Sequence, residues 1–283
     1  MQNISALDET LDVNASLSYH LSIQANPDGF SFCVLDLIRA KYIVLKHFNF
    51  SQGISQEEAL NEIRHIFNAE ELLGKKFKSV YFIMTTPRIT LVPAALFNEE
   101  NAAVCLSISH IVEKSDEVLY KRLKGMDAYA IFAMPSAWKQ LILEKFPNAE
   151  FFQQSIPFID NVFEKNKWIF RPKVYINFQS GFFDITVLNM NKLKLYNCFP
   201  FQNGNDVIYH LMNIYKRFNM NPEEVAVVLS GDISKNSPVF NLLTKYIRDI
   251  RFDKPGDQFI YSYTFKKFDP YIFLNLLNLY TCV

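Results

Sequence analysis

The chain has 283 residues, of which 49% are hydrophobic and only 8 are glycine. Because domains usually contain about 100 to 200 residues, this length predicts two domains, and the apolar fraction excludes a disordered chain. The 29 basic side chains balance 29 acidic ones, so the chain has no overall basic excess of the kind that binds DNA, RNA or an anionic membrane. We therefore expect a folded protein whose partners do not include nucleic acid.

The sequence predicts a cytoplasmic protein without a membrane span. Its first residues, MQNISALDETLD, are acidic where a signal peptide has a basic region followed by an apolar one. The longest stretches without Asp, Glu, Lys or Arg have 15 and 14 residues, fewer than the ~18 residues that indicate a span. The cysteines form no CxxC pair and have no histidine at metal-ligand spacing, which indicates buried thiols and no metal site. They are Cys33, Cys105, Cys198 and Cys282.

The first half of the chain predicts three strands, a helix and a fourth strand, in that order. The first two strands alternate apolar and polar residues, which is the period of a half-buried strand. The turn signal Asn26-Pro27-Asp28-Gly29 separates them. The helix is expected to begin at Ser55, because Ser55-Gln56-Glu57-Glu58 matches a capping box. The four strands are expected at residues 17–25, 30–34, 42–48 and 80–84.

The second half repeats this order. A helix is expected from Asn205 or Asp206 to Phe218, between its third and fourth strands. Two further helices are expected where a proline follows Ser237 and Asp269, because proline is favoured in the first helical turn. The four strands are expected at residues 174–178, 183–187, 193–195 and 225–229.

Both halves therefore predict a βββαβα unit, and the two units form a duplicated α/β architecture. Each unit has three antiparallel strands followed by a parallel crossover. Residues 89–127 are an insertion in the first half, ahead of a strand at 129–134 and helices at 136–146 and 156–163. The predicted domains are residues 1–167 and 168–283. A ligand is expected in the cleft between two such lobes.

This plan resembles the actin-like ATPase fold, a ribonuclease H-like architecture shared by actin, Hsp70, sugar kinases and the bacterial cell-division and pilus-assembly actin homologues. The segment TLVPAALF, at Thr90–Phe97, makes the chain similar to an uncharacterised bacterial family with that fold, a domain of unknown function. The resemblance implies ATP and magnesium as cofactors, held by two phosphate motifs and an adenosine motif.

The second phosphate motif of that superfamily is a strand with an Asp, a glycine-rich turn and a second strand. The segment VYINFQSGFFDITVL, at Val174–Leu188, matches it at Gly181 and Asp184. Asn177 stands where the motif has its first Asp, and only Ser180 and Gly181 remain of the turn's small residues. The resemblance thus extends to this motif in a reduced form.

The other two motifs also depart from the pattern. Ser22 occupies the point on the first strand where the first phosphate motif has an Asp. The adenosine motif appears as VVLSGDIS at Val227–Ser234, where Gly231 matches and Asp232 replaces a second glycine. The candidate nucleotide-binding residues implied by the resemblance are Ser180, Gly181, Asp184, Gly231 and Asp232.

Glycine spacing and missing carboxylates argue against a tight site for a triphosphate. Backbone approaches a phosphate closely only where side chains are absent, and no two glycines here are closer than 21 residues, Gly53 and Gly74. This spacing excludes Walker and Rossmann loops. Ser22 and Asn177 are neutral where magnesium and an attacking water need carboxylates. We therefore expect most hydrolysis to be lost.

Three functions stay open from the sequence. The first is an interaction or regulatory module with an actin-like fold that hydrolyses ATP poorly or not at all and binds a protein partner or a ligand. The second is an active actin-like ATPase or small-molecule kinase that uses Asp184 and Asp232. The third is a structural partner protein. The five histidines form no HxxxH or HExxH, and no GxSxG occurs, so zinc hydrolase and serine hydrolase motifs are missing. The sequence leaves any catalytic residue unknown and predicts no metal ligand.

Overall fold

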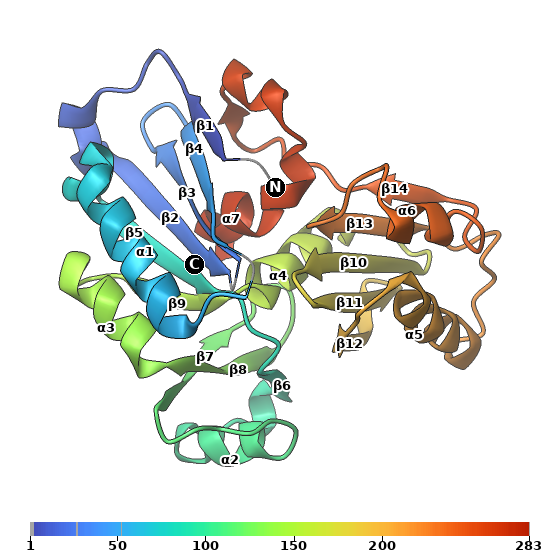
Figure 1. Cartoon of the computed structure of the whole chain (residues 1–283). Helices are drawn as coiled ribbons and strands as arrows, with labels where there is room; N and C mark the ends of the chain where they lie inside the picture. The colour runs from blue at the N-terminus through green and yellow to red at the C-terminus, as the bar shows by residue number, and fades with distance from the viewer. Residues whose placement is uncertain (1–2, 27, 52, 283) are drawn as a thin grey trace. The chain divides into compact units, whose positions relative to one another are not determined.

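The computed structural model describes residues 3–26, 28–51 and 53–282, which fold into two compact units (Figure 1). The first unit contains Met1–Pro157, Gly256–Asp269 and Asn275–Val283, and the second contains Phe158–Pro255 and Pro270–Leu274. The C-terminal segments therefore return to the first unit, whereas the sequence pattern assigned everything after residue 167 to the second. Periodicity marks a segment as helix or strand, but it does not reveal which core the segment joins.

The main sheet of the first unit has the strand order β1-β4-β3-β2-β5-β9, and β15 pairs with β4. Strands β2, β3 and β4 are antiparallel neighbours, whereas β5 is parallel to both β2 and β9. Asn26 pairs with Gly29 at the end of β2 and β3, as the predicted turn requires, although Pro27 lies outside the described residues. The strands are β1 (Ile4–Leu7), β2 (Tyr19–Asn26), β3 (Gly29–Asp36), β4 (Lys41–Asn49), β5 (Ser79–Met84), β9 (Glu150–Gln153) and β15 (Ile260–Tyr261).

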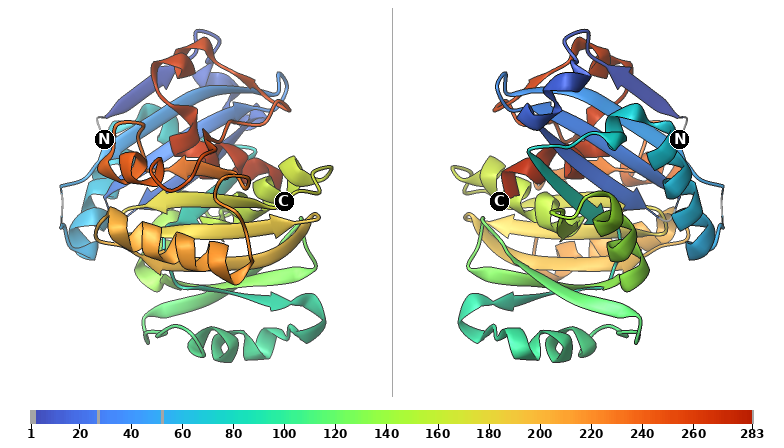
Figure 2. Two further views of the ribbon diagram at one scale, coloured as in Figure 1. Left: turned by 90° about the vertical axis from the view of Figure 1, so that its right-hand side faces the viewer. Right: turned by 90° about the vertical axis from the view of Figure 1, so that its left-hand side faces the viewer.

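A smaller antiparallel sheet occupies the position of the predicted insertion. It consists of β6 (Ile89–Pro93), β8 (Ala128–Pro135) and β7 (Asp116–Arg122), in that order. Helix α2 (Ala102–Ser107) lies along it (Figure 2) and contributes Ala102 and Leu106 to a small core with Ile131 and Ala133 of β8. The small sheet extends beyond the predicted insertion, because β8 is its central strand.

The sheet of the second unit has the order β12-β11-β10-β13-β14. Alternate residues of β10, among them Val174, Ile176 and Phe178, belong to a hydrophobic core. Helices α5 (Gly204–Arg217) and α6 (Pro238–Leu243) contribute to the same core. Burial of such side chains contributes about 1.5–3 kcal/mol each. The strands are β10 (Lys173–Gln179), β11 (Phe182–Asn189), β12 (Lys192–Pro200), β13 (Val227–Gly231) and β14 (Ile250–Phe252).

The two main sheets share an order of strands. In the first unit the series β4-β3-β2-β5-β9 has the same directions as the series β12-β11-β10-β13-β14 in the second. Helix α1 (Gln56–Ala69) connects β4 to β5, and α5 (Gly204–Arg217) connects β12 to β13. The βββαβ order predicted for each half is therefore present in each unit.

Helix boundaries follow from local capping. Ser55 accepts a hydrogen bond from the Glu58 N–H, and the Glu58 side chain accepts one from the Ser55 N–H, so the predicted capping box is confirmed. Ser237 caps α6 with Pro238 in the first turn, also as predicted. The remaining α-helices are α3 (Ser136–Lys145), α4 (Ser155–Asn166), α6 (Pro238–Leu243) and α7 (Leu274–Asn278). Short 3₁₀ helices cover Val13–Ser18, Glu71–Gly74, Ala94–Leu96, Glu99–Asn101, Tyr263–Lys267, Pro270–Phe273 and Leu279–Cys282.

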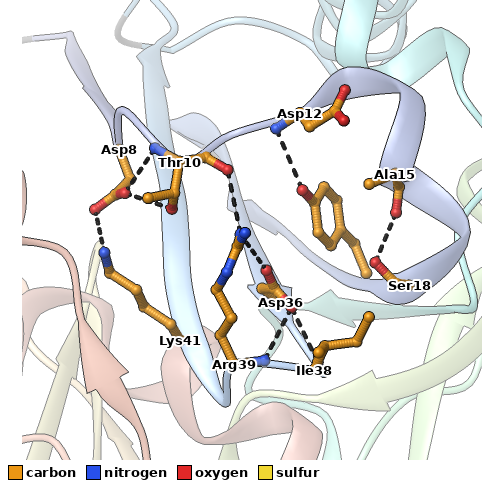
Figure 3. A network of polar contacts seen from close by, with 10 residues as sticks. Asp8, Thr10, Asp12, Ala15, Ser18, Asp36, Ile38, Arg39 and Lys41 are labelled. Carbon is orange, nitrogen blue, oxygen red and sulfur yellow. Dashed lines mark hydrogen bonds and ion pairs between the residues drawn. The ribbon is translucent and has the colours of Figure 1, made fainter.

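Charged side chains fix the chain beside β1 and β4 in the first unit (Figure 3). The Asp8 carboxylate accepts hydrogen bonds from the Thr10 N–H and hydroxyl at 2.9 and 2.6 Å, and it forms an ion pair with Lys41 at 2.8 Å. Burial opposes its ionisation, but Lys41 and the hydrogen bonds to the carboxylate prevail and hold the pKa of Asp8 well below its usual range. The network therefore stabilises this sheet edge with Asp8 ionised.

Candidate functional site

The hairpin of β10 and β11 carries the reduced phosphate motif. Gln179 pairs with Phe182, so Ser180 and Gly181 form a two-residue turn. Gly181 has φ +79°, a left-handed conformation that favours glycine, and no atom lies within 4 Å of the place where a Cβ would be. The left-handed conformation that this turn requires therefore accounts for a glycine at position 181.

Four polar residues stand opposite one another across the second sheet. In the strand register Cys198 of β12 faces Asp184 of β11, Asp184 faces Asn177 of β10, and Asn177 faces Ser230 of β13. We call this row the polar ladder. Because successive residues of a strand point to opposite faces, the ladder lies on the face opposite the core that contains Ile176 and Phe178.

The Asp184 carboxylate is 0% exposed and receives hydrogen bonds from its own sheet. The Tyr196 hydroxyl donates to one oxygen at 3.0 Å, and the Asn177 amide donates to the other in a longer contact of 3.5 Å. The Ser230 hydroxyl donates to the Asn177 amide oxygen at 3.2 Å. Asp184 is thus buried, and both oxygens of its carboxylate accept hydrogen bonds from neighbouring strands.

The carboxylate also affects the neighbouring thiol. Burial raises the pKa of Cys198, and the negative charge of Asp184 beside it acts in the same direction. The Cys198 thiol therefore stays protonated. All four cysteines are thiols, although only Cys33 and Cys282 are fully buried.

At the end of β13 the backbone turns back onto β10. Gly231 has φ +81°, and a Cβ at this position would lie 2.1 Å from the Phe178 carbonyl oxygen and 2.8 Å from the Asn177 side-chain oxygen. The Asp232 N–H donates to the Phe178 carbonyl at 2.9 Å, and the Ile233 N–H donates to the Gly231 carbonyl at 2.8 Å. Gly231 is thus required for close approach of two strands, and these two amides are bonded within the chain.

The structure places all five candidate residues in the second unit. Asp184 and Gly231 both lie beside Asn177, whereas Ser180 and Gly181 occupy the turn beyond the end of β10. Asp232 is exposed and follows β13. The sequence did not identify Tyr196 or Ser230. Polar residues at facing positions of neighbouring strands were the available signal, but they become visible only when the register is known.

In the first unit Ser22 belongs to a buried chain of hydrogen bonds. His20 Nε2 lies 2.9 Å from the Ser22 hydroxyl, and His20 Nδ1 lies 2.8 Å from the Ser79 hydroxyl. The imidazole packs against the rings of Tyr81 and Tyr280, with centroids 4.5 and 4.8 Å away. Burial lowers the pKa of His20 to about 3, so the ring is neutral. The Ser22 hydroxyl is therefore hydrogen-bonded to a neutral imidazole.

A second polar group, which the sequence did not identify, lies where β2, β5 and β9 end. The Thr86 N–H donates to the Gln154 side chain at 3.0 Å, and the Gln153 amide donates to the Thr86 carbonyl at 2.7 Å. Asn26 accepts hydrogen bonds from Gln24 and Thr85. The side chains that form these hydrogen bonds are amides and a hydroxyl.

The chain belongs to the DUF3822 family of proteins of unknown function, whose model matches residues 8–250. A protein of unknown function with an actin-like ATPase fold from Bacteroides thetaiotaomicron is similar in structure, with a TM-score of 0.82, 24% identity, and coverage of 97% of this chain and 100% of that one. The PilM-PilN type IV pilus biogenesis complex is similar with a TM-score of 0.57, 13% identity, and coverage of 93% and 98%. None of the curated proteins matches the chain.

These comparisons confirm the predicted family and the actin-like ATPase fold. In residues 3–26, 28–51 and 53–282, no three or more His, Cys, Asp or Glu residues are grouped so that they could hold a metal ion. No helix within those same ranges has the length and apolar character needed to cross a membrane.

The two left-handed glycines make a matched pair for a stability test. We expect Gly181→Ala to lower the free energy of unfolding by about 1–2 kcal/mol, the cost of a left-handed alanine. Gly231→Ala carries the same backbone cost, and its methyl group must also displace β10, which adds about 1–3 kcal/mol. Urea unfolding of both variants measures the difference, and equal losses would contradict the close approach of β13 to β10.

His20 predicts a specific loss of stability in acid. Its pKa is about 3 in the folded chain against 6.5 for the ordinary group, so below pH 6.5 the unfolded chain binds a proton that the folded chain does not. Stability contributed by the neutral ring is therefore present above that value and falls by about 1.4 kcal/mol per pH unit as the pH drops towards 3.

Comparison with a variant isolates this effect from other titrating groups. His20→Gln keeps a hydrogen-bonding side chain but cannot titrate. Between pH 7 and pH 5, we expect the stability difference between wild type and variant to shrink by about 2 kcal/mol in urea unfolding. A difference that is constant with pH would show that His20 is protonated in the folded chain.

Proposed function

We propose that this chain is an actin-like protein that hydrolyses ATP poorly or not at all and acts as an interaction or regulatory module. The observation that supports this most strongly is the polar ladder, in which the carboxylate of Asp184 is buried and bonded to Tyr196 and Asn177. A carboxylate that positions magnesium or water must instead present oxygen atoms to the ligand. Under this proposal the chain keeps the actin-like fold but has lost efficient ATP hydrolysis.

The remaining groups at the expected phosphate positions support the same view. Asn177 and Ser22 are neutral, and both are hydrogen-bonded to neighbouring side chains. Magnesium in phosphate sites is usually held by one or two carboxylates together with phosphate oxygens. These residues therefore do not fit a magnesium-bridged triphosphate.

The backbone at the candidate adenosine motif gives independent support. Nucleotide phosphates bind to backbone amides that are free of other partners, usually where glycines permit close approach. Here the N–H groups of Asp232 and Ile233 donate to carbonyls of the same unit. Binding a phosphate to these amides would require both hydrogen bonds to break.

A protein partner is the other part of the proposal. The PilM-PilN assembly shows that a chain with this overall fold occurs in a complex with another protein. We also propose a cytoplasmic location, because the four cysteines are free thiols, as is usual in a reducing compartment. The Bacteroides neighbour supports a bacterial origin, and the shared strand order of the two main sheets supports an internal duplication.

Hydrolysis and binding of nucleotides test the proposal directly. We expect purified wild-type protein with Mg-ATP to release no phosphate above a protein-free blank. Thermal melting with ATP, ADP or GTP should not shift, whereas a ligand at 100 times its dissociation constant would stabilise the protein by about 2.7 kcal/mol. Calorimetric titration with the same nucleotides should show no heat of binding.

Two variants identify the outcome that would contradict this proposal. Asp184→Asn removes the charge of the carboxylate, and Tyr196→Phe removes only one of its hydrogen-bond donors. Turnover that Asp184→Asn abolishes and Tyr196→Phe preserves, with both variants still folded by circular dichroism, would establish an ATPase or kinase with an atypical site.

A further inference from the structure

The loop between α4 and β10 presents large apolar side chains to solvent. Trp168 is 85% exposed and Phe170 is 65% exposed. The other tryptophan of the chain, Trp138, is only 3% exposed. Large aromatic side chains usually bury most of their surface, so two exposed aromatic residues separated by one position at a loop tip require an explanation.

Basic residues flank this tip on both sides. The segment KNKWIFRPK, residues 165–173, contains four cationic side chains and no acidic one, in a chain whose total charge is zero. Lys165 forms an ion pair with Asp253, and Lys167 forms one with Glu164. Arg171 is exposed, and it makes no ion pair with any residue in the described part of the chain. The neutral total therefore conceals a local positive excess.

The base of the loop is fixed by hydrogen bonds. The Asn166 amide, at the end of α4, donates to the Val162 carbonyl at 2.6 Å and to the Tyr175 hydroxyl of β10 at 2.7 Å. The Ile169 N–H donates to the Asn166 carbonyl at 3.0 Å. Asn166 and Tyr175 are both buried. The tip thus projects from an anchored base, which lowers the entropic cost of using it for binding.

We propose that residues 167–173 form a contact site for an anionic lipid surface. Trp168 and Phe170 enter the interfacial region of the bilayer, where aromatic rings are favoured because one part of that region is apolar and the other is hydrated. The exposed Arg171, with Lys167 and Lys173 near it in the sequence, supplies positive charge for the negatively charged headgroups. A site of this size gives weak, reversible attachment and no span.

Charge and size favour lipid over a protein as the occupant. A second group of exposed apolar residues, Val104, Ile108 and Ile111 in and after α2, has Glu99, Glu100 and Glu113 near it in the sequence, and an anionic surface repels these carboxylates. The loop combines aromatic residues with cations instead. A stable protein interface buries about 800 Å² on each partner, far more than the tip of a single short loop supplies.

Vesicle binding by the full-length protein tests this site. The probes are vesicles of phosphatidylcholine alone and vesicles that also contain phosphatidylserine. We expect sedimentation with the phosphatidylserine vesicles only, reduced by added salt. Tryptophan emission should shift to shorter wavelength and be quenched by brominated lipid, and this signal belongs to Trp168 because Trp138 is already buried.

Three variants distinguish the proposed lipid contact from nonspecific binding through exposed apolar residues. Trp168→Ser combined with Phe170→Ser should abolish sedimentation and quenching. Arg171→Glu should lower the partition coefficient roughly thirtyfold, from a change of two charges near the surface. Ile108→Ser combined with Ile111→Ser, which removes equally exposed apolar residues in acidic surroundings, should bind like wild type.

Several results would overturn the lipid site. They are no binding to phosphatidylserine vesicles, equal binding to both kinds of vesicle, or an equal loss in the Ile108 and Ile111 control. Binding of the loop to a protein in the absence of vesicle binding would also overturn it. None of these results depends on nucleotide turnover, so failure here is distinguishable from failure of the proposed function.

Discussion

The register between β10 and its neighbours β11 and β13 determines which polar side chains meet in the second unit. It aligns Asn177 with Asp184 on one side and with Ser230 on the other. A shift of one residue would turn Asp184 towards the apolar core and Phe183 away from it. Gly231 helps to hold this register, because only a glycine permits β13 to approach the Phe178 carbonyl so closely. The partners of the buried carboxylate are consequently determined by the strand pairing.

Sequence patterns predicted where helices and strands occur much better than which of them pair or pack together. Alternating apolar residues marked β2 and β3 in the first unit and β10, β11 and β12 in the second, and runs of apolar residues marked β4, β5 and β13. The Ser55 capping box marked the start of α1. Strand β9 was not predicted, because its four residues are too few to show a period. The same limit applies to β1. The return of the C-terminal segments to the first unit depends on packing between residues far apart in the chain, which no local pattern contains.

The candidate site shows a similar division. Asp184 and Gly231 could be selected from their motif positions, whereas Tyr196 could not, since its hydrogen bond to Asp184 joins two strands. His20 was one of five histidines without a metal or hydrolase motif. Its partner Ser79 lies 59 residues further along the chain, so only the folded sheet brings the two together. Sequence spacing therefore identified single polar positions but not the networks that satisfy them.

The two faces of the second sheet explain how the proposed loss of ATP hydrolysis is compatible with an intact fold. One face carries the apolar residues that pack under α5 and α6, and these hold the unit together through buried area. The other face carries the polar ladder. Because neighbouring positions of a strand point to opposite faces, substitutions on the ladder face leave the apolar core unchanged. A motif carboxylate can then be replaced by Asn177 at little cost to folding, provided that each buried polar group keeps a partner, as Asp184 does in Tyr196.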